Sequence, residues 1–292
     1  MQSVSYVFYR YSIHYNDSPV SPAEQWDLFK RILALEVAHR KTDESEAEKD
    51  TSLVELDQIP VEINGEEVVA FFFKIAKHIT ARDSFSYDKD ADRMLPKSQS
   101  TDEYCCGQIV VVPSVRVLAA ADRSGTEYLS AISTVSRLRS IIHFDKRLRL
   151  LYEPTGSKSD IMKALKGWRI EEISFAAKPY NPSIHTPGDR LHSLLAPDNA
   201  RISGRARPVG GEFLTPSEDG FIEEIVGLRE KGYADLGARG KTQQGYEARI
   251  QRGDAEKQGK PRIIKVTIPI EPNEPFENQM REVARAILEI YG

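Results

Sequence analysis

Cysteine is scarce in this sequence, and its placement excludes a disulfide framework. The two cysteines, Cys105 and Cys106, are adjacent, so a bond between them would close a strained ring and join no distant segments. We expect one buried and one partly exposed thiol in a reducing compartment. The alternative is a redox switch, but the neighbouring Asp102 and Glu103 would raise a thiol pKa rather than lower it.

Long apolar runs are absent as well. No stretch approaches the roughly 18 apolar residues of a transmembrane helix. The first residues lack the basic and apolar regions of a signal peptide. The sequence therefore predicts a cytoplasmic protein without a membrane partner. Its 292 residues, 40% apolar and 29% charged, allow one large domain or two small ones with an ordinary hydrophobic core.

Motifs for the common catalytic and cofactor sites are missing. No Gly-x-x-x-x-Gly-Lys-Ser/Thr and no strand-linked Gly-x-Gly-x-x-Gly would cradle a phosphate, and no Gly-x-Ser-x-Gly marks a serine nucleophile. His185 and His192 lack a third ligand at a useful spacing for zinc. His78 begins a single His-x-Thr, whereas two-histidine phosphoesterases need two copies. We therefore expect neither a cofactor nor a metal ion.

Hydrophobic periodicity predicts both strands and helices. Apolar patterns predict strands at residues 4–15, 68–79, 109–121, 148–152, 170–175, 233–239 and 263–268, the last two forming one hairpin. Helical spacing and capping residues predict helices at 21–40, 128–142, 160–166, 215–231 and from 273 onward. Loops are predicted at 41–57, 82–104 and 182–212. Because turn signals such as Asn64-Gly65 favour hairpins, we expect an α+β fold of mostly antiparallel sheet flanked by helices.

Charge is distributed unevenly along the chain. Residues 1–104 hold 12 Lys/Arg against 20 Asp/Glu, whereas residues 105–292 hold 28 against 24. A weak boundary near residues 155–160 would divide the chain into an N-terminal unit, 1–155, and a basic C-terminal unit, 156–292, unless the two form one continuous domain. The asymmetry indicates a surface in the C-terminal part that faces a polyanion.

Arg137 and His143 are one pair of candidates for catalysis. They are separated by five residues, a gap that occurs in the active-site motif of a helical ribonuclease superfamily. There the histidine acts on a ribose hydroxyl and the arginine holds phosphate. The chain departs from that motif at Leu138, where the superfamily usually has a polar residue. The alternative is a helix with a basic outer face.

Glu171, Glu172 and Lys178 are a second group of catalytic candidates, because they share one predicted strand. Metal-dependent nucleases of the restriction type hold a divalent ion with such carboxylates and orient water with the lysine. The spacing of six residues between Glu172 and Lys178 departs from the spacing of two in that pattern. The alternative is that both glutamates are solvated at a sheet edge.

Basic side chains cluster in the C-terminal half. Residues 137–169 hold nine Lys/Arg against three acids, and residues 229–265 hold ten against five. Lysine and arginine contacts to phosphates give sequence-independent, salt-sensitive affinity, and Trp168 and Tyr180 would stack on bases if they are exposed. The alternative is an ordinary surface whose basic residues pair with the acidic N-terminal part. The predicted nucleic-acid-binding residues are Arg137, Arg139, Arg147, Arg149, Lys163, Lys166, Arg169, Arg201, Arg205 and Arg207.

Two stretches carry a resemblance to known families. The run from Trp168 to Phe175 with Pro179-Tyr-Asn-Pro182, and the later Gly232-Tyr-Ala…Gly240…Gly245, resemble uncharacterised bacterial families of unknown function. These families occur among phage-defence and mobile-element genes. The resemblance implies a link to antiviral defence and transfers no functional residue.

Three functions follow as hypotheses. The first is a nucleic-acid-binding or accessory protein of a bacterial anti-phage defence system, whose partner is DNA, RNA or another defence protein. The second is a divergent nuclease or toxin-like effector enzyme. The third is a structural partner or homo-oligomer, in which the aromatic N-terminal strand extends a neighbour's sheet.

Overall fold

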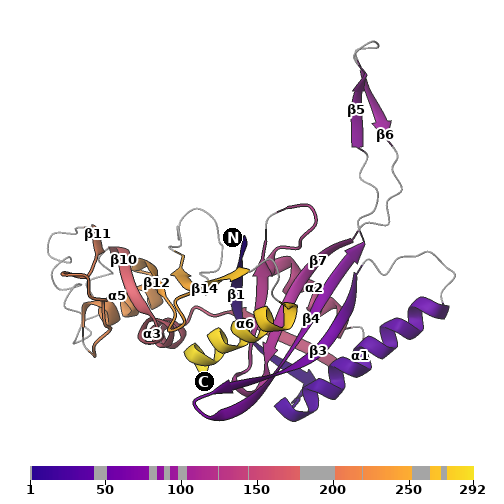
Figure 1. Ribbon diagram of the computed structural model, residues 1–292, viewed down its shortest axis with the longest axis horizontal. Helices are drawn as coiled ribbons and strands as arrows, with labels where there is room; N and C mark the ends of the chain where they lie inside the picture. The colour runs from indigo at the N-terminus through magenta and orange to yellow at the C-terminus, as the bar shows by residue number, and fades with distance from the viewer. Residues whose placement is uncertain are drawn as a thin grey trace.

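One antiparallel sheet of twelve strands runs through both halves of the chain (Figure 1). The computed structural model describes residues 2–42, 51–78, 84–88, 93–97, 104–123, 125–143, 145–177, 201–218, 220–251, 264–270 and 275–292. In sheet order the strands are β11 (Ile202–Ala206), β10 (Arg169–Ala177), β12 (Ala234–Lys241), β13 (Glu247–Ile250), β14 (Ile264–Ile270), β1 (Gln2–Tyr15), β8 (Val117–Asp122), β7 (Tyr104–Val112), β4 (Glu66–His78) and β3 (Thr51–Ile63). Two more, β2 (Ser18–Pro19) and β9 (Leu148–Pro154), pair with β1 outside this order. The predicted α+β class with a mostly antiparallel sheet is confirmed.

The long strand β1 lies between the two halves of the sheet. It pairs with β14 along residues 2–7, with β8 along residues 5–10 and with β9 along residues 9–15. Its alternation, predicted from the sequence, places Val7, Tyr9 and Tyr11 in one apolar core and Tyr6 and Phe8 in the other. Both faces of β1 are therefore buried, and the sheet is continuous across the predicted boundary near residues 155–160.

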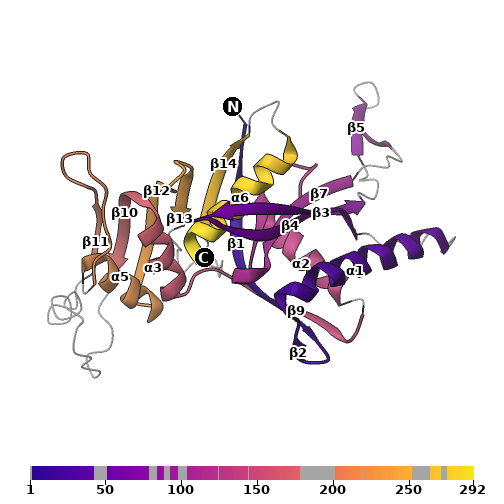
Figure 2. The ribbon, with the colours of Figure 1, turned by 60° about the horizontal axis from the view of Figure 1, so that its bottom comes forward.

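Helices cover the two faces of the sheet in different places (Figure 2). Helices α1 (Pro22–Thr42) and α2 (Ala131–Ile142) pack on the Val7 face, over β3, β4, β7, β8 and β9. Helices α3 (Lys158–Gly167), α5 (Phe221–Glu230) and α6 (Phe276–Tyr291) belong to the Tyr6 core. The predicted strand at 109–121 is interrupted by a 3-10 turn, η1 (Pro113–Val115), which joins β7 to β8. None of the described helices is long and apolar enough to cross a membrane.

Capping residues explain where two helices begin. At the predicted start of α1, the Ser21 amide donates a hydrogen bond to Glu24 Oε2 at 3.0 Å, as in a capping box. Helix α3 begins at Lys158, two residues before the predicted start, and is capped by Ser157. The reason is Asp160, which lies three residues after Ser157 and returns the bond to its amide, so that both terminal donors are satisfied.

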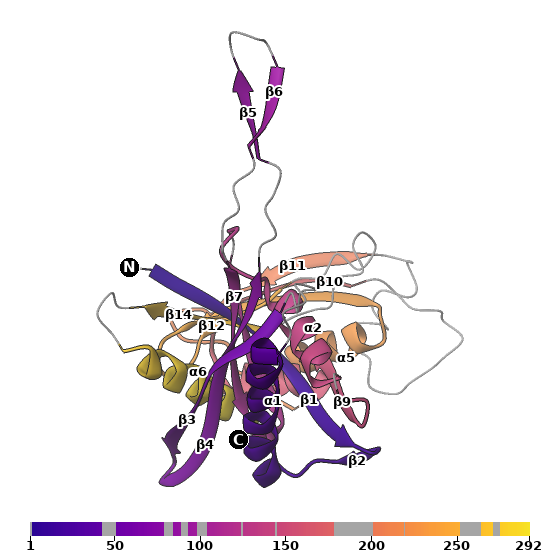
Figure 3. The same ribbon diagram turned by 90° about the vertical axis from the view of Figure 1, so that its right-hand side faces the viewer.

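Five strands lie, wholly or in part, where a loop or a plain hairpin was predicted. The predicted loop at 41–57 is wrong from Thr51 onward, because β3 begins there. The predicted loop at 182–212 contains β11. Residues 82–104 contain β5 (Ser84–Asp88) and β6 (Arg93–Lys97), a separate two-stranded sheet that projects from the large one (Figure 3). The predicted hairpin at 233–268 is also wrong, because β13 lies between β12 and β14.

Candidate functional site

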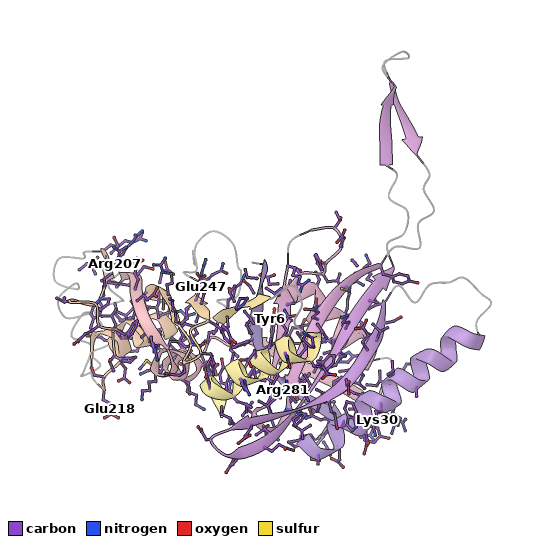
Figure 4. All side chains as sticks on the ribbon, in the orientation of Figure 1. Tyr6, Lys30, Arg207, Glu218, Glu247 and Arg281 are labelled. Carbon is purple, nitrogen blue, oxygen red and sulfur yellow. The ribbon has the colours of Figure 1, made fainter. Side chains whose placement is uncertain are left out.

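The strands β10, β12, β13 and β14 bury one face and present a polar one. Leu236, Ala238 and Ile250 point into the core that holds α5 and α6, whereas Arg239 and Arg249 alternate with them and are exposed. Both helices that contact β10, β12 and β14 in the described chain belong to that core. We call the opposite side of β11, β10, β12, β13 and β14 the open face. Figure 4 shows Arg207 and Glu247 on this side, away from Arg281 of α6.

A row of cations crosses the open face at right angles to the strands. In the ladder register Glu172 faces Arg239, Arg239 faces Arg249, and Arg249 faces Lys265. Arg207 extends the row at the β11 end, because its guanidinium binds Glu172. Four strands and Arg207, which directly follows β11, thus contribute four cations and one carboxylate to one line, which we call the cationic row. Like charges directly opposite on neighbouring strands are destabilising, so we expect the row to lower the stability of the fold.

A β-bulge places two glutamates beneath these cations. The register of β10 shifts between Ile170 and Glu172, and both Glu171 and Glu172 then face the open side. Glu172 accepts a hydrogen bond from Arg207 Nε at 2.7 Å, and Arg205 Nε lies 3.9 Å from its carboxylate. The Arg207 hydrogen bond, together with the charges of Arg205 and other arginines, lowers the pKa of Glu172.

Glu171 also lies between two basic side chains, Arg239 and Lys241. Arg239 Nε lies 3.6 Å and Lys241 Nζ 3.9 Å from its carboxylate. The side chains of Glu172 and Glu171 are only 19% and 33% exposed, whereas the four cations bound to them are between 50% and 68% exposed. The carboxylates are therefore recessed, and the solvent-facing layer above them is cationic.

Two further cations of the open face each form an ion pair with one carboxylate. Arg249 Nη2 lies 3.2 Å from Glu247, and Lys265 Nζ lies 2.5 Å from Asp122 at the end of β8. Arg169 also faces this side, because its register partner is Lys241. Over the described strands the open face holds seven cations, Arg169, Arg205, Arg207, Arg239, Lys241, Arg249 and Lys265, against five carboxylates, Glu171, Glu172, Asp235, Glu247 and Asp122.

The ten residues predicted to bind nucleic acid do not form one surface. Arg169, Arg205 and Arg207 lie on the open face, and Arg201 is exposed just before β11. Arg137 and Arg139 lie on α2, Arg147 and Arg149 lie at the start of β9, and Lys163 and Lys166 lie on α3. Of the predicted binding residues between 137 and 169, only Arg169 thus lies on the same face as Arg205 and Arg207.

Arg137 and His143 are bound to two different strands. Arg137 Nη1 donates to Thr51 Oγ1 of β3 at 2.7 Å. The backbone amide of Leu150, in β9, donates to His143 Nε2 at 3.1 Å. Burial, together with Arg139 and Arg149, lowers the pKa of His143. The imidazole ring is thus neutral, and its Nε2 accepts a hydrogen bond from the Leu150 amide. This hydrogen bond links the end of α2 to β9.

Two other predicted basic residues, Arg147 and Arg149, have local partners. Arg147 donates two hydrogen bonds to Asp145, which together with its backbone amide lower the pKa of that carboxyl to about 2. Arg149 Nη1 lies 3.0 Å from Asp17. These contacts tie β9 to its neighbouring turns.

Two members of the second predicted catalytic group, Glu171 and Glu172, also form contacts with basic side chains. Glu171 and Glu172 are held by arginine and lysine, and Lys178 lies outside the described residues. Within the described ranges no three His, Cys, Asp or Glu side chains are grouped to hold a metal ion. His185, His192 and Tyr180 also lie outside those ranges.

Two further predictions concern buried side chains. Trp168 is buried in the core and therefore unavailable for stacking on a base. Cys105 is buried and Cys106 partly buried, as predicted. Burial raises the pKa of the Cys106 thiol despite the nearby Lys74 and Arg123, so it is not an activated thiolate.

No protein-family model and no curated protein matches this chain. The geometry of the open face therefore carries the functional argument. Four cations of that face were not among the predicted binding residues: Arg239, Lys241, Arg249 and Lys265. In the sequence they alternate with apolar neighbours. That alternation was the available signal, but it gives no information on which strands are adjacent.

Proposed function

We propose that the protein binds nucleic acid through the open face, as a non-catalytic or accessory component. The observation that carries the proposal is the cationic layer above Glu171 and Glu172. Phosphate groups bind arginine and lysine without regard to base sequence, and guanidinium groups suit them because they donate two parallel hydrogen bonds. An accessory role in bacterial antiviral defence, implied by the resemblance, is part of this proposal.

The stability cost of the cationic row supports a polyanionic ligand. Arg239, Arg249 and Lys265 carry like charges on three neighbouring strands. Arg249 and Lys265 each form an ion pair with one carboxylate, and Arg239 lies beside Glu171 and faces Glu172. A line of phosphates laid along the row would relieve this repulsion, which is stronger at low ionic strength. Self-neutralisation is a weaker account, because seven cations face five carboxylates.

A binding role is favoured over catalysis by the state of the acidic residues. Nuclease chemistry of the restriction type needs carboxylates that are free to hold a metal ion. Glu171 and Glu172 are each held by two cations. The two glutamates instead position the guanidinium groups of the neighbouring arginines. This arrangement suits a surface that binds a ligand without reacting with it.

A salt titration with a matched pair of variants tests the proposal. The wild-type protein should bind generic fluorescent DNA and RNA oligonucleotides, with log K falling linearly as log salt rises. Arg239→Ala/Arg249→Ala should weaken binding and reduce the slope by about 1.4 for a single strand, at about 0.7 per lost phosphate contact. Arg139→Ala/Arg149→Ala removes two exposed arginines from α2 and β9 and should leave both values unchanged. No binding at any salt concentration would reject the proposal.

A further inference from the structure

An exposed aromatic ring lies at one end of the open face. Phe213 is 46% exposed in the segment between β11 and α5. The next residue, Leu214, forms a bridge with Ile170 of β10 and packs into the helix-covered core. Because neighbouring side chains of an extended segment point to opposite sides, Phe213 faces the open side.

The ring is already associated with a guanidinium group of the same face. The Arg169 guanidinium carbon lies 5.9 Å from the centroid of the Phe213 ring. Arg169 in turn faces Lys241 in the ladder, so the ring adjoins the cations around Glu171. An aromatic face beside an arginine plane is the combination on which unpaired bases stack.

We propose that the ligand of the open face is single-stranded nucleic acid, with phosphates along the cationic row and one base stacked on Phe213. This inference rests on the function proposed above. A duplex keeps its bases stacked inside, so it can use the cations but not the ring. A single strand presents base faces and backbone together, and a sheet surface can accept both side by side.

The experiment compares three probes on the folded full chain. These are a short single-stranded oligonucleotide, the duplex of the same length, and heparin, a polyanion without bases. The single strand should bind more tightly than the duplex. Phe213→Ala should weaken single-strand binding by roughly 5- to 100-fold, the usual contribution of one base–aromatic stack. It should leave the salt slope and the affinities for duplex and heparin unchanged.

Two variants separate stacking from a general loss of structure. Phe213→Trp keeps a π face and should restore single-strand binding, whereas Phe213→Leu keeps an apolar side chain and should not. Phe221→Ala is the matched control, because Phe221 is similarly exposed (42%) but packs on Phe175 at the helix-covered core. It should not alter binding, and circular dichroism confirms that each variant is folded.

The outcomes distinguish this inference from the function on which it rests. Equal affinity for single strand and duplex, or an unchanged affinity in Phe213→Ala, would overturn the single-strand inference and leave nucleic-acid binding in place. Binding to heparin but to neither nucleic acid would overturn both. Loss of binding to all three probes in Arg239→Ala/Arg249→Ala, with loss confined to the single strand in Phe213→Ala, would support both.

Discussion

Arg239 and Arg249 face each other across β12 and β13, and Lys265 continues the line on β14. This relationship predicts a conflict between stability and binding at one position. Arg249→Thr removes the central charge and adds a good strand former, so the free energy of unfolding should rise by about 0.5 kcal/mol at low salt. Affinity for polyanions should fall in the same variant.

Chemical denaturation at two ionic strengths measures the stability part. The gain should shrink at high salt, because screening removes the repulsion that Arg249→Thr relieves. Arg149→Thr is the control, since Arg149 is also an exposed strand arginine but pairs with Asp17. A destabilised Arg249→Thr would contradict the account of the cationic row.

The ion pair between Arg10 and the buried Asp160 should be a main stabilising link between β1 and α3. Arg10 Nε donates to Asp160 Oδ1 at 2.8 Å, and the side chain of Asp160 is 3% exposed. Asp160→Ala removes a buried carboxylate that accepts hydrogen bonds from Arg10, whose own side chain is 36% exposed, and should lower the free energy of unfolding by about 1.5 kcal/mol. Thermal or urea unfolding measures this, and Arg10→Met/Asp160→Leu should recover most of the loss.

The same pair predicts a loss of stability in acid. Burial opposes ionisation of Asp160, but hydrogen bonds from Arg10 and Ser157 outweigh it, so the pKa is lowered. The unfolded state then binds more protons than the native state as the pH falls below about 4, and stability decreases there. The difference in the free energy of unfolding between wild type and Asp160→Ala should therefore become smaller as the pH falls below about 4. A constant difference from pH 7 to pH 2 would argue against this assignment.

Glu289 of α6 predicts the opposite pH dependence near neutrality. Burial, with a contribution from Glu282, raises its pKa from 4.5 to about 7. Between these values the native state binds more protons than the unfolded state, so this group lowers stability as the pH rises. Glu289→Gln should therefore melt at a higher temperature than wild type above pH 7 and should lack that slope. Identical melting curves from pH 5 to pH 8 would contradict the prediction.

Two glycines should respond to alanine in opposite directions. A Cβ on Gly240 would lie 2.5 Å from the Arg169 carbonyl oxygen, at the bulge where β12 approaches β10 closely. Gly240→Ala should destabilise by about 2 kcal/mol, because backbone must move. Gly227 lies inside α5 with its nearest neighbour, Lys158 Nζ, at 3.9 Å, so Gly227→Ala should stabilise by up to about 1 kcal/mol. Urea midpoints of the two variants measure both effects.

Elements with strong local signals were predictable from the sequence. The alternation of β1 and the capping pair Ser21 and Glu24 each depend on residues close together in the chain. The first part of β3 was missed because a register shift between Val54 and Asp57 breaks its alternation, with Glu55 at φ 54°. The four-residue β13 is too short for a periodic pattern.

The candidate site depended on pairing information that the sequence does not contain. The basic character of Arg205 and Arg207 was visible, and both lie on the open face. The row through Arg239, Arg249 and Lys265 appears only when β13 is placed between β12 and β14. Spacing alone also suggested a joint role for Arg137 and His143, whose hydrogen bonds lead to separate strands.

The position of β1 has a consequence for how the chain is synthesised. A ribosome makes β1 before its neighbours β8 and β14, which begin at Val117 and Ile264. Until those segments emerge, a strand with two apolar faces lacks its ladder partners and is open to association with other nascent chains. The centre of the sheet therefore cannot fold until the segment that contains β14 has been translated. A chaperone that binds β1 would protect the nascent chain during this time.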